Sequence, residues 1–500
     1  MRYDVGIVGS GIGGLLVGAF LAKEGFKVAV FEKNRQFGGA LQIFSRSKKI
    51  IDTGIHYIGG LDEGQNLHLI LSYLGVFKPE DFIRLDPDCF DGVWPGGEFC
   101  IYPLAQGFDN FARVLSDFFP SEKSALRRYA AVMQEVTQSA PLFHLQLPAD
   151  TYLSNPYLGM AAYEYIDQSF KDPLLKKVLA GNSLIYDGRS AATSFYTHAM
   201  TMASYVQSAW RPRKGSHTLA TGLVKAIQSW GGQLFNYSEI HQILNQTSGA
   251  WRVCDLQKRV FECQRLVMAV HPTVVARVVP SECLPPSFRR KVRLGDSSPS
   301  LTLHLALKPG TIPYRNHNIY GNPCGEVWNG AARNPFDHWG MFWTPDEAHP
   351  GYASVINVLT YCPEKVFQKW QSTFRTQPHY PETRDPEYEA LKSHLAEEFL
   401  ESLPEALHIT SESIASVSVS TPLTWRDYIG SPNGSMYGIL KDYHRPGNGI
   451  FSPVIIPDRL YYTGQNMNLH GVTGTALSAL LTAGAFIGLE HLLKRIRTEA

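Results

Sequence analysis

The glycine-rich turn near the N-terminus constrains the fold more than any other feature of the chain. A short apolar run over 5–8 leads into Gly9-Ser10-Gly11-Ile12-Gly13-Gly14, which opens an Ala- and Leu-rich stretch over 15–23. A second apolar run over 28–31 ends at Glu32. A strand, a tight turn, a helix and a second strand within roughly 30 residues form the opening unit of a parallel α/β sheet.

The spacing of these glycines matches the GxGxxG pattern of dinucleotide-binding turns. Gly9 permits the tight turn, Gly11 lets a pyrophosphate approach the backbone, and Gly14 lets the helix pack closely on the strand. An acidic residue at the end of the second strand can accept hydrogen bonds from ribose hydroxyls. The expected contacts here are Gly9, Gly11, Gly13, Gly14, Glu32 and Lys33. The alternative is a tight turn that binds nothing.

Two further glycine motifs distinguish between dinucleotides. Gly38-Gly39 follows Glu32 after five residues, and Thr463-Gly464-Gln465 follows a predicted strand over 460–462. The first motif resembles the E-x5-GG extension of the glutathione-reductase-like superfamily, which implies FAD. In that superfamily the last strand ends in Gly-Asp, so the resemblance implies that Gln465 bonds the ribityl chain by its amide. It also implies that the backbone N–H groups of residues 472–474 lie near the flavin. The remaining expected FAD contacts are Gly38, Gly39, Ala40, Leu41, Glu239, Ile240, Gly464, Gln465, Gly471, Val472 and Thr473.

Composition excludes several classes of protein. The 500 residues carry a formal net charge of +1, whereas a nucleic-acid binder normally shows a basic face. The seven cysteines form no CxxC pair, which favours a reducing compartment, free and mostly buried thiols, and no metal site. The longest apolar stretch, 475–489, is shorter than the roughly 20 residues that span a bilayer and is interpreted as a buried helix. We expect a cytoplasmic protein, with peripheral membrane contact as an option.

Two kinds of segment alternate along the chain. Segments 1–65, 215–290 and 440–500 have the α/β pattern and are assigned to an FAD-binding domain; segments 66–214 and 291–439 are more aromatic and are assigned to a substrate-binding domain. The predicted fold class is α/β, a glutathione-reductase-like Rossmann FAD domain with an interleaved α+β substrate domain. Helices are predicted over 66–74, 108–118, 121–138 and 219–230, from Asp385-Pro386, and from about Gly474.

The segment Asp52-Thr53-Gly54-Ile55-His56-Tyr57-Ile58-Gly59 resembles retinol saturases, within the larger family of phytoene-desaturase-type and carotenoid-isomerase-type flavoenzymes. The C-terminal Thr463-Gly464-Gln465-Asn466 is similar to the ending of the saturase branch, and Trp425-Arg426-Asp427-Tyr428 resembles another family stretch. The resemblance implies an FAD-dependent oxidoreductase acting on C–C or C=C bonds of an apolar isoprenoid or polyene. The electron donor or acceptor is not indicated.

Saturating a C=C bond requires a hydride and a proton, so a proton donor near the flavin is expected. His56, Tyr57 and His470 are the candidates because their segments lead into the expected site. The alternative for each is a purely structural side chain. Asp52 can instead cap its loop, and Arg426 can simply pair with Asp427.

Three other functions compete with this hypothesis. A flavin amine oxidase shares the fold, but Ala40 stands where such enzymes have Arg. A non-catalytic escort that binds flavin or prenyl groups would show no turnover. A dehydrogenase that uses only nicotinamide is disfavoured by Gly38-Gly39 together with Gly464-Gln465.

Overall fold

The computed structural model describes residues 1–149, 151–246, 249–329, 334–374 and 384–500. The chain begins with the predicted unit: β1 (Arg2–Val8), α1 (Ile12–Lys23) and β2 (Val28–Phe31). β1 and β2 pair in parallel, from Val5 opposite Val28 to Val8 opposite Phe31. All four residues of β2 are buried, which explains why this strand is an uninterrupted apolar run.

The sheet around this unit collects strands from distant parts of the chain. Its parallel strands lie in the order β10-β2-β1-β13-β20, and the antiparallel β11–β12 hairpin and β19 extend it. The added strands are β10 (Gln233–Phe235), β11 (Ile240–Asn245), β12 (Trp251–Asp255), β13 (Val260–Met268), β19 (Val454–Ile456) and β20 (Leu460–Tyr462). Parallel pairing brings the carboxyl ends of β1, β2, β13 and β20 to one edge.

Helix α1 lies at the centre of the half that contains this sheet. Residues 13–22 of this helix are all buried, and it packs against α8 (His217–Ser229) and α13 (Gly471–Ile487). α14 (Leu489–Glu499) packs on α13 and on α2 (Asn66–Tyr73). In the described ranges no single helix is long and apolar enough to cross a membrane. α13 and α14 have the required length and apolar composition only when they are taken together, and the chain bends by 117° between them.

A second sheet of seven strands forms the other half, in the order β18-β14-β17-β16-β15-β7-β8. Only its β15–β7 pair is parallel. Its strands are β7 (Asp91–Trp94), β8 (Tyr102–Leu104), β14 (Ser300–Leu307), β15 (Asn318–Gly321), β16 (Trp339–Pro345), β17 (Ala353–Tyr361) and β18 (Ile414–Ser420). Trp339 and Trp343 of β16 pack toward α11 (Pro386–Ser402), whereas Phe342 joins the central core, because side chains of a strand alternate between its faces.

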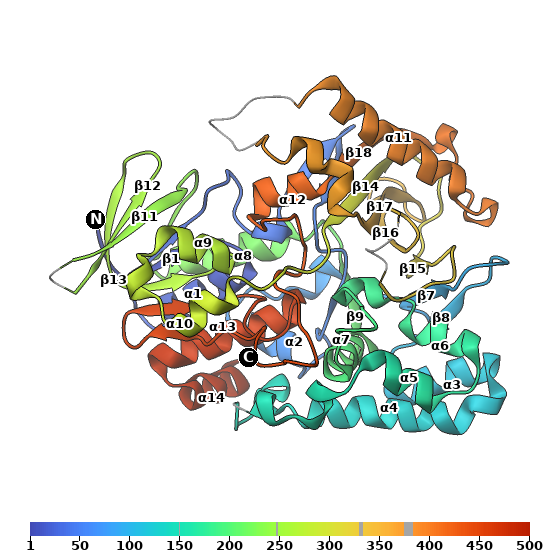
Figure 1. The fold of residues 1–500 in the computed structure, drawn as a ribbon, viewed down its shortest axis with the longest axis horizontal. Helices are drawn as coiled ribbons and strands as arrows, with labels where there is room; N and C mark the ends of the chain where they lie inside the picture. The colour runs from blue at the N-terminus through green and yellow to red at the C-terminus, as the bar shows by residue number, and fades with distance from the viewer. Residues whose placement is uncertain (150, 247–248, 330–333, 375–383) are drawn as a thin grey trace.

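Helices complete this half of the molecule. Figure 1 shows α11 in orange beside the second sheet and the cyan and green helices α3 to α7 gathered along one side. The helices not yet given are α3 (Phe108–Phe118), α4 (Lys123–Gln138), α5 (Ala162–Ser169), α6 (Pro173–Ala180), α7 (Phe195–Gln207), α9 (Pro272–Val278), α10 (Pro286–Lys291) and α12 (Pro422–Ile429). Two small sheets, β3–β4 (Ile43–Arg46, Lys49–Asp52) and β5-β9-β6 (Ile58–Gly59, Ala209–Pro212, Phe82–Arg84), join the halves.

Two local predictions were wrong. α13 begins at Gly471 rather than near Gly474, because Gly471 has a φ of +76° and the chain turns into the helix there. All seven cysteines are free, but only Cys263 and Cys362 are buried; Cys100 and Cys324 are exposed, and the other three are half-buried. The predicted helix cap at Asp385 is confirmed, since its side chain accepts a hydrogen bond from Tyr388 N.

Asp52 caps a different segment from the one predicted. Its Oδ1 accepts hydrogen bonds from Ser216 N (2.7 Å) and Ser216 Oγ (2.8 Å) at the start of α8, 164 residues away. Burial raises the pKa of this carboxyl from 3.8 to about 6, although the two hydrogen bonds oppose the shift. Asp52 therefore joins β4 to α8 as a buried acid.

This raised pKa predicts how stability depends on pH. The folded state binds the Asp52 proton more tightly than the unfolded state, so stability is lost as the pH rises from about 4 to about 6. Asn at this position keeps the acceptor oxygen but does not ionise. Asp52→Asn should therefore gain stability relative to the wild type across this window, by up to about 3 kcal/mol. Urea unfolding at pH 4, 5, 6 and 7 measures this; a difference that does not change with pH contradicts the prediction.

Candidate functional site

A cavity of about 740 Å³ lies along the carboxyl ends of the parallel strands. Val8, Phe31, Ala269 and Tyr462, at or just beyond the ends of β1, β2, β13 and β20, line it together with the first turns of α1 and α13. Ligands of open parallel sheets bind at this edge. From there the cavity continues toward α7 and the second sheet, so it has a polar end and an apolar end.

The β1–α1 turn forms a cradle at the polar end. Gly9 has a φ of +100°, and a Cβ on Gly14 would lie 2.2 Å from Gly9 O, so both positions require glycine. A Cβ on Gly11, in contrast, would meet nothing within 4 Å. The open space at Gly11 borders the N-terminus of α1, whose free N–H groups favour an anion. This turn can therefore hold a pyrophosphate.

Glu32 closes the next side of the cradle. Its Oε2 accepts hydrogen bonds from Ser10 N (3.1 Å) and Ser10 Oγ (2.5 Å), and its Oε1 accepts one from Asn34 N (2.8 Å). Burial raises the pKa of Glu32, against the effect of these hydrogen bonds. The carboxyl lines the cavity beside the glycine turn, where a ribose would lie.

The glycine pair Gly38-Gly39 packs directly on the β1–α1 turn. Gly38 N donates to Ser10 O (3.0 Å), and Gly38 and Gly39 have φ values of +121° and +58°. A Cβ on Gly39 would lie 2.9 Å from Gly11 Cα. Ala40 and Leu41 follow in a short 3-10 turn, and all four residues line the cavity.

The other predicted contacts on this side also line the cavity. Lys33 donates from Nζ to Asp427 O (2.7 Å), and burial lowers the pKa of Lys33. Glu239 and Ile240, at the start of β11, lie on the wall near Ser238. Glu239 O accepts a hydrogen bond from Leu256 N (2.9 Å).

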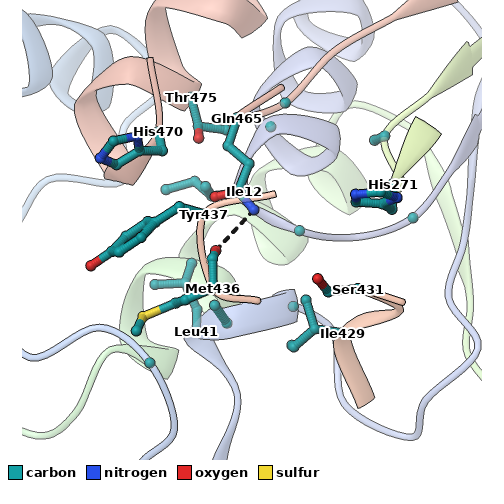
Figure 2. Close-up of a pocket in the computed structure, with 18 of the residues that line it drawn as sticks. Ile12, Leu41, His271, Ile429, Ser431, Met436, Tyr437, Gln465, His470 and Thr475 are labelled. Carbon is teal, nitrogen blue, oxygen red and sulfur yellow. Dashed lines mark hydrogen bonds between the residues drawn. The ribbon is translucent and has the colours of Figure 1, made fainter. Parts of the chain in front are cut away.

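The C-terminal motif meets the cavity from the opposite side of α1. A Cβ on Gly13 would lie 3.4 Å from Gly464 Cα, so the two turns are in close contact. Gly471, Val472 and Thr473 form the first turn of α13 and present its N-terminus to the cavity. Gln465 makes a contact that the sequence did not predict: its Nε2 donates to Met436 O (3.0 Å), as Figure 2 shows.

The three candidate proton donors all lie on the cavity wall. The ring of His56 stacks on Phe342 with centroids 4.6 Å apart, and burial lowers the pKa of His56 to about 3. Burial likewise lowers the pKa of His470 to about 3, and His470 Nε2 meets no hydrogen-bond partner within the described part of the chain. Both imidazoles are therefore neutral near pH 7, and their role in proton transfer stays a prediction.

Tyr57 is held in a buried hydrogen-bond network. Its hydroxyl donates to Asp91 Oδ2 (3.1 Å) and bonds the hydroxyl of Tyr320 (2.7 Å). Burial and the nearby Asp91 raise the pKa of Tyr57 far above 10. The ring lines the cavity while the hydroxyl meets this network, which favours the structural alternative for this residue.

Sequence reasoning missed three parts of the site. Ala269, Val270 and His271 line the polar end where β13 runs into α9, and the pairing of an apolar strand with His271-Pro272 could have indicated this edge. The segment 425–437 also lines the cavity, although only its likeness to a family stretch was noticed. The third missed part is the lining of the apolar end, which is mostly apolar and includes Phe143, Ile185, Met200, Thr201, Ser204, Tyr205, Phe342 and Leu359.

Charge is distributed unevenly over the cavity. Among the described lining residues, the acidic side chains are Glu32, Glu239 and Asp427, all at the polar end. Asp427 pairs with Arg426 (2.8 Å), as the sequence suggested, and also with Arg384 (2.6 Å). The apolar end carries aromatic and aliphatic side chains, with Tyr57 stacked on Tyr205 at 4.4 Å. Such a surface suits an uncharged ligand.

Comparisons with known proteins agree with this arrangement. The family described as NAD(P)-binding Rossmann-like domain matches residues 7–74. All-trans-retinol 13,14-reductase of Homo sapiens is 25% identical over 100% of this chain and 88% of its own length. The chain is similar along its whole length to the retinol 13,14-reductases. Prolycopene isomerase 2 of an Oncidium hybrid cultivar is 23% identical over 87% of the chain and 75% of its own length. Phytoene desaturase (lycopene-forming) of Pseudescherichia vulneris is 23% identical over 51% of the chain and 53% of its own length.

The resemblance predicted from residues 52–59 and 463–466 is thereby confirmed. One relative, from Danio rerio, is named inactive all-trans-retinol 13,14-reductase and is 21% identical over 50% of this chain and 44% of its own length. The relatives named as reductase and desaturase are oxidoreductases.

Solved structures define the fold. Wild-type putrescine oxidase bound to putrescine has a TM-score of 0.64 at 15% identity, covering 97% of this chain and 99% of its own. Cyclohexylamine oxidase from Brevibacterium oxydans IH-35A has a TM-score of 0.60 at 14% identity, covering 98% of this chain and 99% of its own. The chain has the flavin amine oxidase-like fold, a Rossmann dinucleotide domain with a substrate domain, and the predicted fold class is confirmed.

The different surroundings of Gly11 and Gly14 predict that the same substitution impairs ligand binding at Gly11 and stability at Gly14. Gly11→Val should leave the melting temperature within about 2 °C of the wild type, because the new side chain enters open space. It should weaken dinucleotide binding, tested with FAD, by at least about hundredfold, because the new side chain would fill the cradle. Gly14→Val should destabilise the protein by roughly 1–3 kcal/mol or more through overpacking against Gly9 and Ala269. Circular dichroism melting and FAD titration of both variants measure this. A Gly11→Val protein that retains FAD would remove the cradle from the site.

Proposed function

We propose that the protein is an FAD-dependent oxidoreductase that acts on C–C or C=C bonds of an apolar isoprenoid or polyene. The observation that carries this proposal is one continuous cavity with two different ends. One end has the glycine turns, helix N-termini and Glu32 that suit a dinucleotide. The other end is aromatic and has no acidic side chain among the described lining residues.

The residues present fit FAD. The open space at Gly11 and the N-terminus of α1 would hold the pyrophosphate, and Glu32 would accept the adenosine ribose hydroxyls. The first turn of α13, at Gly471, Val472 and Thr473, would direct N–H groups to the flavin. The dinucleotide-binding Rossmann domain and the fold of the solved relatives support this assignment.

The bound flavin would supply hydride transfer, and the chain's own residues would orient the substrate and exclude water. Phe342, Tyr205 and Tyr437 provide flat apolar surfaces for a conjugated chain. Neutral His56 and His470 can each donate an N–H hydrogen bond without bringing a charge to the apolar end. Reduction, dehydrogenation and isomerisation all remain compatible with such a site.

An amine oxidase is the second candidate because the solved relatives with this fold include amine oxidases. The apolar end argues against it, since a protonated amine would find no carboxylate among the described lining residues there. A non-catalytic flavin-binding escort is the third candidate, in view of the relative named inactive. Our proposal further includes a cytoplasmic location, with peripheral membrane contact as an option, and an electron donor or acceptor of unknown identity.

Anaerobic spectroscopy tests the main proposal. The purified protein should show flavin absorption, bleach on photoreduction, and regain the flavin bands when all-trans-retinol or a carotenoid is added, while the polyene absorption moves to shorter wavelength. A flavin that reoxidises with amines instead, with release of peroxide in air, would favour the amine oxidase. A flavin that no donor reduces would favour the escort, and failure to bind FAD would remove the proposal.

The position of Glu32 predicts selectivity between flavin nucleotides. Glu32→Ala should weaken FAD binding about tenfold or more, because the lost acceptor serves the adenosine ribose, which FMN lacks. FMN affinity should change less than about threefold. Glu63→Ala, at an exposed position outside the cavity, is the control. Isothermal titration with both nucleotides measures the difference, and equal losses would contradict this placement of the ribose.

A further inference from the structure

The segment 434–440 runs between the two ends of the cavity. One of its edges pairs with 295–300: Ser297 N donates to Gly438 O (2.6 Å), Leu440 N to Gly295 O (3.0 Å) and Ser300 N to Gly434 O (3.1 Å). Antiparallel bridges at Asp296–Ile439 and Pro299–Ser435 continue this pairing. The segment is therefore attached to the rest of the protein along one side like a short strand.

Two consecutive amides of the C-terminal motif hold the segment from another side. Gln465 Nε2 donates to Met436 O (3.0 Å), and Asn466 Oδ1 accepts from Ile439 N (2.8 Å). Gly438 has a φ of +67°, and a Cβ there would lie 2.2 Å from Asn466 Oδ1. This close approach requires glycine, so the backbone of the segment and the amide of Asn466 fit each other specifically.

Tyr437 lies between these two hydrogen bonds. Its ring lines the cavity and contacts His470, with ring centroids 4.5 Å apart. Figure 2 shows Tyr437 and His470 together on one side of the cavity, with Met436 and Gln465 beside them and His271 on the other side. The place of this aromatic pair is therefore determined by where the backbone at 436–439 is held.

The bond to Met436 specifies the chemistry required at position 465. A backbone carbonyl only accepts hydrogen bonds, so the side chain facing it has to donate. The amide of Gln465 satisfies this requirement, whereas a carboxylate would set two acceptors against each other. The hydrogen bond of Gln465 is thus with the protein's own backbone, which differs from the ribityl contact expected from the sequence.

We propose that Gln465 and Asn466 are positioning residues for the apolar end of the cavity. Their amides hold the segment 434–440, which places Tyr437 against His470, and this wall sets the affinity for the apolar substrate. The proposal deepens the proposed function, on which the nature of the ligand rests. It assigns Gln465 to substrate binding through Tyr437 rather than to binding of the dinucleotide.

Two variants of the full-length protein separate these roles. Gln465→Met keeps the length of the side chain without the donor, and Gln465→Glu replaces the donor by an acceptor. The affinity for all-trans-retinol, measured by its fluorescence, should fall roughly fivefold in Gln465→Met and about tenfold or more in Gln465→Glu. FAD affinity should change less than about threefold in both. Gln228→Glu makes the same change of side chain at an exposed position of α8 that does not line the cavity, and should change neither affinity.

Hydrogen exchange provides a readout that needs no ligand. The Ile439 N–H donates to Asn466 Oδ1, and this hydrogen bond weakens if the segment 434–440 moves away from its place. Because Gln465→Glu repels Met436 O in the same segment, the peptide covering 436–441 should exchange about tenfold faster in this variant, while peptides from β1 and β13 stay protected. Unchanged exchange together with unchanged retinol affinity would overturn the proposal. A loss of FAD affinity larger than the loss of retinol affinity would also overturn it, in favour of the ribityl contact. If the wild type binds neither ligand, the proposed function fails, while faster exchange would still support the positioning of Tyr437.

Discussion

The close approach of three glycine turns around the N-terminus of α1 is the constraint on which the rest of the structure depends. Gly39 lies against Gly11, and Gly13 lies against Gly464, so segments separated by more than 400 residues meet within a few ångströms. Side chains at these contacts would separate the turns. Because the contacts are backbone to backbone, the cradle at Gly11 is formed mainly by glycines and helix ends, and it stays open toward the cavity.

The apolar end is stabilised in a different way. Asp91, fully buried, accepts hydrogen bonds from Tyr57, Asn182 and Asn318, and Asn318 in turn accepts one from the buried Arg211. Burial raises the pKa of Asp91 to about 6, against the effect of these hydrogen bonds. These hydrogen bonds hold the members of the buried network in one arrangement, although Asn182 Oδ1 and Arg211 Nε meet no partner among the described residues. It joins β5, β7, β9 and β15 behind the cavity wall, so the wall itself can remain uncharged.

These two kinds of construction determine what could be predicted from the sequence. The glycine turns, Glu32 and the helix cap at Asp385 depend on residues close together in the chain, and local patterns identified them. The lining contributed by α7 and by segment 425–437 depends on how distant elements pack, and no local pattern distinguishes Met200 or Tyr205 from ordinary core residues. In the same way, aromatic periodicity could not show that Phe342 faces the cavity whereas Trp339 and Trp343 face α11.

The sequence by itself determined that the chain starts with a dinucleotide-binding unit, because φ values above zero and close backbone contact select glycine at specific spacings. The overall resemblance of its two ends to one family followed from the same local motifs. Only the tertiary structure decided which groups from distant parts of the chain meet: Asp52 with Ser216, Tyr57 with Asp91, and Gln465 with Met436. The physical reason is that a hydrogen bond depends on distance and direction in space, and an amide or a carboxyl is compatible with many partners until the fold brings one within about 3 Å.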